Sequence, residues 1–391
     1  MKRIYFDHSA TTPLDPRVVE AMQPSFEAGF GNPSSLHWAG QEARQAVDEG
    51  RRQVADLFNA QPDEIVFTAS GTESDNMVLK GVAGQYRPQE CHLVTSSFEH
   101  PAILETCKYM ERMGYAVSYL PVTPDGIVDP EALVRALRPN TRLVSVMAAN
   151  NVVGTLQPIA ELAQIAKAHG ALFHTDAVQA VGKVPLHTDT LPIDFLSLSA
   201  HKLHGPKGIG ALYIRQGVKI EPLVHGGWQE RGMRSATENV AAIAGLGKAA
   251  EIAAAEMSAE AGQLVRLRDR IIADVSEKIP NAYLIGHRYK RLPGHICLGF
   301  AGQEGEAIHL MLALDQAGIA ISTGSACSSH NAGQPSYILT AMGFDPVRAR
   351  GSLRITLGRF NTDAEVDTFL NVLPGLVHDL RPVTSRSFAA A

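Results

Sequence analysis

Residues 194–210 read Asp-Phe-Leu-Ser-Leu-Ser-Ala-His-Lys-Leu-His-Gly-Pro-Lys-Gly-Ile-Gly, a strand-like apolar run followed by a turn rich in glycine and proline. A second strand-like run begins where this turn ends, so Lys202 lies at the end of a buried strand. Most lysines are surface residues, and a surface loop is the ordinary interpretation of any single lysine. A lysine in this position can also form a Schiff base with an aldehyde cofactor. The rest of the chain decides between the two.

Short apolar runs alternate with helical patterns around this segment. The strand-like runs cover residues 64–68, 92–98, 142–147, 171–174, 195–198 and 211–214. The helical patterns cover residues 41–58, 72–85, 102–113 and 159–168. This alternation predicts an α/β protein with a mostly parallel sheet covered by helices. After a long alanine-rich helical stretch at 238–278, an α+β pattern follows, with strands at 295–300 and 353–357 and helices at 304–316 and 364–380.

The composition limits the class of protein. The 391 residues include 45% hydrophobic and 19% charged side chains with a formal net charge of −5, so neither nucleic acid nor an anionic membrane is an expected partner. No apolar run approaches the roughly 20 residues of a membrane helix, and no signal peptide is evident. The cysteines are widely scattered, which argues against a disulfide framework or a zinc site and indicates the cytoplasm. They are Cys91, Cys107, Cys297 and Cys327.

Polar residues follow the strand-like runs, where open parallel sheets bind their ligands. Gly71 and Thr72 stand at a predicted helix start, which suits a phosphate group but also an ordinary helix cap. Asp176 would need a cationic partner if buried, such as a protonated pyridine nitrogen, or it caps the next helix. His100 could stack on a planar ring and exchange protons, or it is a solvated loop histidine.

Further candidates carry equally open interpretations. Gln179 could hydrogen-bond a ring hydroxyl or be a polar helix residue, and Asn150 follows another strand-like run. Cys327 lies among small and polar residues that predict an exposed loop, where an unused cysteine is a chemical liability. Arg354 could bind a carboxylate through its guanidinium group or be a surface strand residue. Asn32 could belong to a loop over an active-site mouth or be a turn residue.

Together these segments resemble the cysteine desulfurases, pyridoxal-phosphate enzymes of the fold-type I, class V aminotransferase group. The matching pieces run from Tyr-Phe-Asp-His-Ser-Ala-Thr-Thr-Pro at 5–13 to Ser-Leu-Arg-Ile-Thr-Leu-Gly-Arg-Phe at 352–360. The resemblance implies the fold of a PLP-dependent transferase. It implies a large PLP-binding domain at 16–256 and a small α+β domain, made from 1–15 and 257–391, that carries the cysteine loop.

The resemblance also implies a role for each matching residue. Lys202 would carry pyridoxal phosphate as a covalent aldimine and move the substrate's α-proton. His100 would stack on the ring and transfer protons, and Cys327 would be the nucleophile that takes up sulfur as a persulfide. The cofactor-binding residues would be Gly71, Thr72, His100, Asp176, Gln179, Ser199, His201, Lys202 and, from the other protomer of a homodimer, Thr237. The substrate-binding residues would be Asn32, Asn150 and Arg354; no metal is expected.

The implied reaction converts L-cysteine to L-alanine and passes the sulfur from Cys327 to an acceptor protein, for iron–sulfur cluster assembly or another sulfur-containing product. After Cys327 the chain has Ala-Gly-Gln-Pro where many housekeeping members have Leu-Glu-Pro, and its tail lacks their extended scaffold-binding segment. The acceptor therefore stays open among general iron–sulfur assembly, nitrogenase maturation, DNA phosphorothioation and tRNA thiolation. The alternative activities are selenocysteine lyase or another class V lyase, and a non-catalytic protein of this fold.

Overall fold

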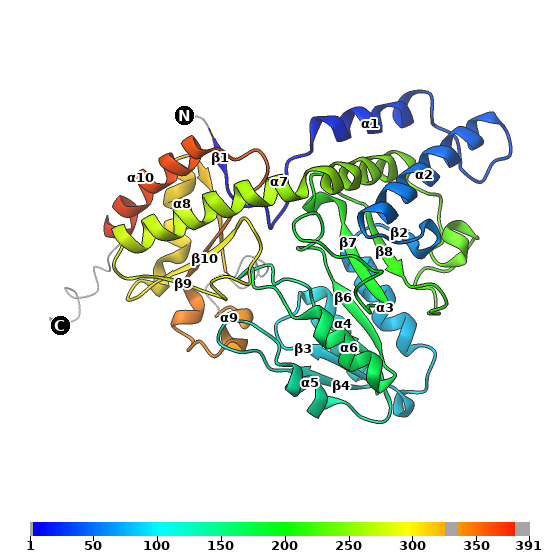
Figure 1. Ribbon diagram of the computed structural model, residues 1–391, viewed down its shortest axis with the longest axis horizontal. Coiled ribbons are helices and arrows are strands. Elements are labelled where there is room, and N and C mark those ends of the chain that lie inside the picture. The colour runs from blue at the N-terminus through cyan, green and yellow to red at the C-terminus, as the bar shows by residue number, and fades with distance from the viewer. Residues whose placement is uncertain (1–2, 325–334, 380–391) are drawn as a thin grey trace, which may run out of the picture.

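A seven-stranded sheet forms the centre of the larger part of the molecule (Figure 1). The computed structural model describes residues 3–324 and 335–379 of the chain. The strands are β2 (Ile65–Thr68), β3 (His92–Ser96), β4 (Ala116–Leu120), β5 (Thr141–Ser145), β6 (Leu172–Asp176), β7 (Phe195–Ser199) and β8 (Gly210–Ile214). Their order is β2-β8-β7-β6-β5-β3-β4, and only β8 runs antiparallel to its neighbours. The predicted mostly parallel sheet is confirmed.

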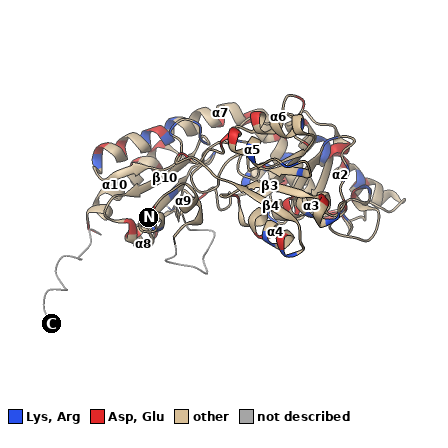
Figure 2. Cartoon of the chain, turned by 90° about the horizontal axis from the view of Figure 1, so that it is seen from below, with Lys and Arg blue, Asp and Glu red and all other residues tan. Residues whose placement is uncertain are grey.

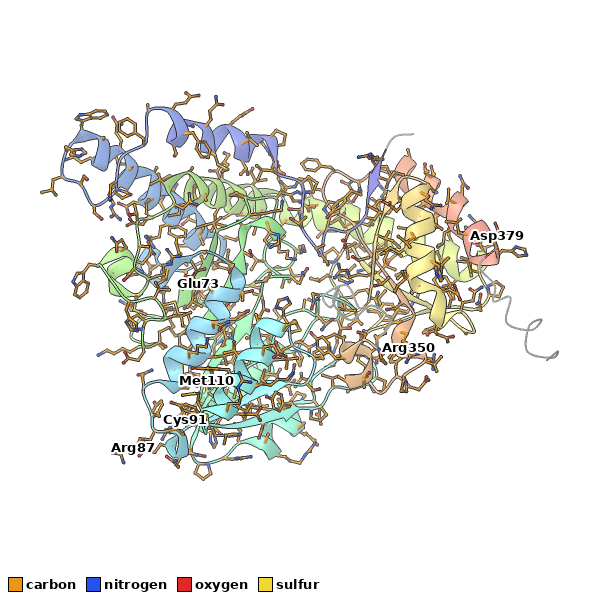
Figure 3. All side chains as sticks on the ribbon, turned by 180° about the vertical axis from the view of Figure 1, so that it is seen from behind. Glu73, Arg87, Cys91, Met110, Arg350 and Asp379 are labelled. Atoms are coloured by element: carbon orange, nitrogen blue, oxygen red, sulfur yellow. The ribbon has the colours of Figure 1, made fainter. Side chains whose placement is uncertain are left out.

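Helices cover both faces of this sheet because its strand residues are apolar on both sides. On one face, Leu93, Leu143 and Phe195 pack in a core with residues of α3 (Gly71–Ala83) and α4 (Pro101–Arg112). Cys91 and Met110 belong to this same core and lie close together in Figure 3. The alternate strand residues face a second core shared with other helices. Those helices are α1 (Pro16–Glu27), α2 (Trp38–Leu57), α5 (Pro130–Ala136), α6 (Ile159–His169) and α7 (Val240–Lys278).

The helices begin where the sequence supplies a cap. Asp15 accepts a hydrogen bond from the backbone N–H of Arg17 at 3.0 Å, with Pro16 at the first position of α1. His100 caps α4 in the same way, followed by Pro101. Gly170 ends α6 in the left-handed conformation, with φ of 86°, which glycine adopts without steric cost.

A smaller antiparallel sheet joins the end of the chain to its beginning. Its strands are β9 (Ala282–Leu284), β10 (His295–Phe300), β12 (Ser322–Thr323) and β13 (Ser352–Thr356), in the order β12-β13-β10-β9. A separate parallel pair is formed by the short strands β1 (Ile4–Tyr5) and β11 (Ile319–Ala320). The helices of this part are α8 (Ala307–Gln316), α9 (Tyr337–Ala341) and α10 (Asp363–Asp379). Phe6 therefore shares a core with Leu267 and Phe369.

The helix α7 connects the two parts of the molecule (Figure 1). Its 39 residues span about 58 Å at the α-helical rise, and its second half packs against α10 through ion pairs such as Arg266–Asp363. We propose the division expected from the sequence, 16–256 and 1–15 with 257–391, because Ile4 and Phe6 pack in the same core as the second half of α7. Residues of β10 and α9 nevertheless join the large core, so the two parts share an apolar contact.

Charged residues of both signs occur on helices in both parts of the molecule in Figure 2. Lys and Arg alternate with Asp and Glu along the helices in Figure 2, so neither sign forms an extended field in this view. Within residues 3–324 and 335–379, no helix is long and apolar enough to cross a membrane.

Candidate active site

A cavity of about 380 Å³ lies at the carboxyl ends of the parallel strands, where the small sheet meets the large one. Its walls combine residues from both ends of the chain, from Ser9 to Arg354. The predicted site residues that line it are Gly71, Thr72, His100, Asp176, Gln179, Ser199, His201, Lys202 and Arg354. The structure thus brings most of the predicted residues into one place.

Lys202 stands at the edge of this cavity on a short 3₁₀ helix, Ala200–Lys202, directly after β7. Its Nζ donates hydrogen bonds to the carbonyl oxygens of Ser9 and Ala10, the latter at 2.9 Å. The N-terminal segment is fixed in turn, because Ser9 N donates to Thr356 Oγ1 at 2.9 Å. The ammonium group of Lys202 is therefore held by a segment anchored to the small sheet.

One end of the cavity is built to receive an anion. Ser70 Oγ accepts from the N–H of Glu73 at 3.1 Å, and the Glu73 carboxylate, labelled in Figure 3, accepts from Ala69 N at 3.0 Å. The first N–H groups of α3 have no partner within the helix and lie at the cavity, at Gly71 and Thr72. A Cβ on Gly71 would meet Val178 Cγ2 at 2.5 Å, so a larger residue here would displace the Val178 side chain. Such a helix start binds phosphate or carboxylate groups.

His201 and Ser199 line the cavity beside this helix start. The Nδ1 of His201 lies 3.1 Å from Thr11 Oγ1. Burial, and then the charge of Lys202, lower the pKa of His201 to about 4, so the ring is neutral at pH 7. A neutral imidazole can donate one hydrogen bond to an anion without adding a charge.

The other end of the cavity contains a buried carboxylate. Asp176 ends β6 and is 5% exposed, and its Oδ1 accepts from Val178 N at 2.9 Å. Burial raises the pKa of Asp176, while a positive charge on His100, the hydrogen bond from Val178 N and the charge of Lys202 act in the opposite direction. A cation placed against Asp176 would stabilise the ionised form.

His100 lies at the cavity with a defined tautomer. Its Nδ1 accepts from the N–H of Ala102 at 3.2 Å, so the neutral ring carries its proton on Nε2. Burial lowers the pKa of His100, and Asp176 partly opposes that shift. The imidazole is thus a neutral group that can give or take a proton near pH 7.

Arg354 forms the opposite wall, on β13. Its side chain is almost fully buried, with Nη2 2.7 Å from Asp7 Oδ1 and Nη1 donating to the carbonyl of Asn151 at 3.1 Å. Its Nε has no hydrogen-bond partner among the described residues. A buried guanidinium N–H without a partner is costly, and the group is suited to a carboxylate ligand.

The structure corrects the prediction for Asn150. That side chain is fully buried and points away from the cavity: it donates to Phe98 O at 3.0 Å and accepts from Val152 N and Val153 N at 2.8 and 3.0 Å. The adjacent Asn151 lines the cavity instead. The sequence signal was an asparagine pair after a strand, and only the turn geometry decides which member faces the ligand.

Two further predicted residues lie elsewhere in this single chain, and one lies outside the part of it that is described. Asn32 is exposed in a turn where its Oδ1 accepts from Ser34 N at 2.9 Å, and it does not line the cavity. Thr237 is also exposed and does not line the cavity. It belongs to the segment 228–239, between β8 and α7. Cys327 lies outside the described residues.

Several cavity residues were not predicted. Ser9 and Ala10 contribute backbone carbonyls, and Ser9 Oγ also donates to Gln179 Oε1 at 3.3 Å. Asp75, on α3, lines the cavity although the polar residues around it resemble those of an ordinary helix surface. The period of a buried helix face is the signal that could have identified Asp75, because Val78, Leu79 and Val82 are buried on the same helix.

Comparison with known proteins connects this geometry to a family. The sequence matches the family described as aminotransferase class-V over residues 4–369. The chain belongs to this family. The cysteine desulfurase IscS of Dictyoglomus turgidum is 49% identical over 385 residues, which cover 98% of this chain and 97% of that protein.

Similar solved structures agree with this assignment. A NifS-like protein superposes with a TM-score of 0.90 at 40% identity, covering 97% of this chain and all 100% of that one. A structure described as SspA in complex with cysteine gives a TM-score of 0.81 at 34% identity, covering 92% and 100%. The predicted fold class and the resemblance to cysteine desulfurases are confirmed.

The class-V family uses pyridoxal phosphate as its cofactor, and the cavity fits this molecule. The volume lies within the range of small-molecule sites. The start of α3 at Gly71 and Thr72 lies at the cavity and suits an anion, and the buried carboxylate of Asp176 suits a pyridinium cation. Lys202 has the amine that an aldehyde requires.

Proposed function

We propose that this protein is a cysteine desulfurase. The net reaction converts L-cysteine and the Cys327 thiol to L-alanine and a Cys327 persulfide. The observation that carries this proposal is the meeting of Lys202, Asp176, His100 and Arg354 at one cavity, in a chain 49% identical to a protein named cysteine desulfurase.

The proposed cofactor-binding residues divide between the two ends of the cavity. The phosphate group would accept hydrogen bonds from Gly71 and Thr72, with Ser199 and His201 beside it. At the other end, Asp176 would pair with the pyridine nitrogen, and Gln179 would donate its second amide hydrogen to the ring oxygen. When bound through Lys202, pyridoxal phosphate supplies an electron sink for the carbon that carries the amino group.

The substrate would be held by its carboxylate. Arg354 is the proposed partner, because its buried Nε lacks a hydrogen bond and its Nη atoms are fixed by Asp7 and Asn151. We propose Asn151 in place of Asn150 as the amide that contacts the substrate, because Asn151 lines the cavity. Asn32 does not line the cavity of its own chain. We therefore propose that it contacts the substrate in the cavity of the other subunit.

Two groups would move protons. Lys202 would take the α-proton of cysteine and return a proton to the product, and the Ser9 and Ala10 carbonyls would orient its Nζ between those steps. His100 carries a proton on Nε2 and would exchange it with the substrate sulfur as the carbon–sulfur bond breaks. The thiolate of Cys327 would form the new sulfur–sulfur bond.

The proposal includes a homodimer. Thr237 lies in an exposed segment with large exposed apolar side chains nearby in sequence and on the α1–α2 connection, such as Trp228 at 86% and Phe30 at 72% exposed. Phe30 and Trp38 pack edge to face, with ring centroids 6.4 Å apart. Apolar groups of this size on a surface support a partner contact. In the dimer, Thr237 would reach the phosphate site of the other subunit.

We propose a protein as the sulfur acceptor and the cytoplasm as the location. The free thiols of Cys91, Cys107 and Cys297, all buried, support a reducing compartment. Iron–sulfur cluster assembly is the proposed use of the sulfur, because a relative bears the name IscS.

The decisive experiment supplies L-cysteine and a reductant to the full chain loaded with pyridoxal phosphate. Equal amounts of alanine and sulfide are expected, with a persulfide on Cys327 found by mass spectrometry before the reductant is added. Full sulfur release by Cys327→Ala would exclude the proposed nucleophile. Faster turnover of selenocysteine than of cysteine, independent of Cys327, would favour a selenocysteine lyase.

A further inference from the structure

A buried polar network lies beneath the cavity, between the large sheet and α3. Strand pairing places Ser145 opposite His174 and Ser197 opposite Asp176, on β5, β6 and β7. His174 Nδ1 lies 2.8 Å from Ser145 Oγ, and its Nε2 lies 3.0 Å from Ser197 Oγ. His174 and Asp176 are two residues apart on one strand and therefore face the same side of the sheet.

Asp75 enters this network from α3. It is 1% exposed, its Oδ1 lies 3.6 Å from His174 Nε2, and this oxygen has no hydrogen-bond partner among the described residues. Asp75 also lines the same cavity as Asp176. Two carboxyl groups thus approach one buried space, and like charges in such a place do not both ionise at neutral pH.

The surrounding groups favour ionisation of Asp176 over that of Asp75. The hydrogen bond from Val178 N, at 2.9 Å, and the charge of Lys202 both lower the pKa of Asp176. Burial has the largest influence on Asp75, its acidic neighbours are Asp176 and Glu99, and a hydrogen bond with Ser197 acts in the opposite direction.

His174 does not change this balance. Burial lowers the pKa of His174 to about 3, so the imidazole beside Asp75 is neutral at pH 7 and offers no compensating charge. Burial, followed by Asp176 and Glu99, raises the pKa of Asp75 well above its ordinary value.

We propose that Asp75 is a positioning residue held as a neutral carboxylic acid, which leaves Asp176 as the ionised partner of the cofactor's pyridine nitrogen. The inference rests on the proposed cofactor site and deepens it. Asp75 keeps its proton beside the His174–Ser197 pair and does not compete for the ring cation. A second carboxylate in its place would draw the ring cation away from Asp176 or raise the pKa of Asp176 further.

The first test is the pH dependence of stability in Asp75→Asn. An aspartate with a raised pKa binds a proton in the folded state that the unfolded chain releases above about pH 4. The folding equilibrium of the wild type therefore weakens as pH rises, by up to about tenfold per pH unit, while the asparagine contributes no such loss. The ratio of the variant's folding constant to that of the wild type is expected to rise from pH 5 to pH 8, measured by urea unfolding of the full chain. A constant or falling ratio overturns the proposal.

The second test needs no variant at Asp75 and applies even if that variant does not fold. Infrared spectra of the cofactor-loaded full chain, grown with ¹³C-labelled aspartate, should contain a protonated-carboxyl band at pH 7 that shifts with the label. The label separates the aspartates from Glu99, and retention of the band in both Asp176→Asn and Asp194→Asn assigns it to Asp75. Absence of the band, or its loss in either variant, overturns the proposal. Both readouts are independent of sulfur release, so failure of the desulfurase assay with the band present contradicts the proposed function alone.

Discussion

The floor of the cavity, formed by Asp176, His174 and Lys202, and the exposed segment 228–239 differ in where their side chains find partners. At the floor, Asp176, His174 and Lys202 find their partners within the same chain, and most of these groups are buried. The exposed segment instead places Trp228 and Thr237 on the surface. In the proposed dimer, the residues of the cavity floor would act within one subunit, whereas Thr237 and Asn32 would contact the cofactor and substrate of the other.

The exposed segment is nevertheless rigidly attached. Glu230 and Arg231 both have left-handed backbone conformations, with φ of 47° and 58°. The buried Glu230 carboxylate forms a bidentate pair with Arg51, at 2.7 Å for each contact, and also accepts from Phe67 N at 2.9 Å. These contacts of Glu230 attach the segment to β2 and offset the backbone strain at Glu230 and Arg231.

The largest effect is expected at the floor. Lys202→Ala should reduce alanine formation by at least roughly 10⁴-fold, because both cofactor attachment and proton transfer are lost. The visible absorbance of the bound cofactor should change with it. Lys207→Ala, an exposed lysine five positions along the same loop, is the matched control and should retain activity. Equal losses in the two variants would mean that the loop, not the amine, is responsible.

The second prediction removes the Glu230–Arg51 ion pair that attaches the exposed segment. Glu230→Gln leaves the buried Arg51 without a counterion, which costs about 3–5 kcal/mol of unfolding free energy. Denaturant unfolding measures the loss, and Glu131→Gln, whose side chain is 86% exposed and 3.6 Å from Arg135, should cost less than about 1 kcal/mol. Similar costs for both variants would contradict the attachment described above.

The third prediction separates the two regions directly. Thr237→Ala should weaken cofactor affinity by about 10–100-fold through the loss of one hydrogen bond to a charged group, with the fold unchanged. Thr368→Ala, on the surface of α10, is the control. An unaltered dissociation constant in a protein that is dimeric by light scattering would remove Thr237 from the shared site.

The smallest expected effect concerns His100. An ordinary histidine is half protonated near pH 6.5, but burial lowers the pKa of His100, so its neutral form persists below that pH. Reducing the pH from 7.5 to 6.5 should therefore lower kcat/KM by less than about twofold. An acidic limb centred at or above pH 6.5 that disappears in His100→Gln would contradict this.

The sequence predicts the sheet and many of the residues that line the cavity, because both depend on local patterns. The apolar runs at β5 and β7 and the polar residues after them are contiguous in the chain, so the strand ends can be identified without a structure. β4 was missed because it is only partly buried and contains Ser118 and Tyr119, which interrupt the apolar pattern. The antiparallel direction of β8 was also missed. It depends on the short connection between β7 and β8, and the composition of a strand does not indicate its direction.

The remaining errors concern orientation. Asn150 and Asn151 are chemically identical, and the bonds from Asn150 to the turn that follows β5 decide which of them faces the cavity. Asp75 was missed for the opposite reason, because a carboxylate among polar helix residues resembles a solvated one until the sheet packed against it is known.

The pairing of β1 with β11 has a consequence for synthesis on the ribosome. The segment that binds Lys202 through Ser9 and Ala10 is made first, but its own supports, Ala320 and Thr356, are made last. At ordinary elongation rates they follow roughly 20–70 s later. The nascent chain therefore cannot close its catalytic cavity before nearly all of it has emerged, so capture of the cofactor is expected to be a post-translational event.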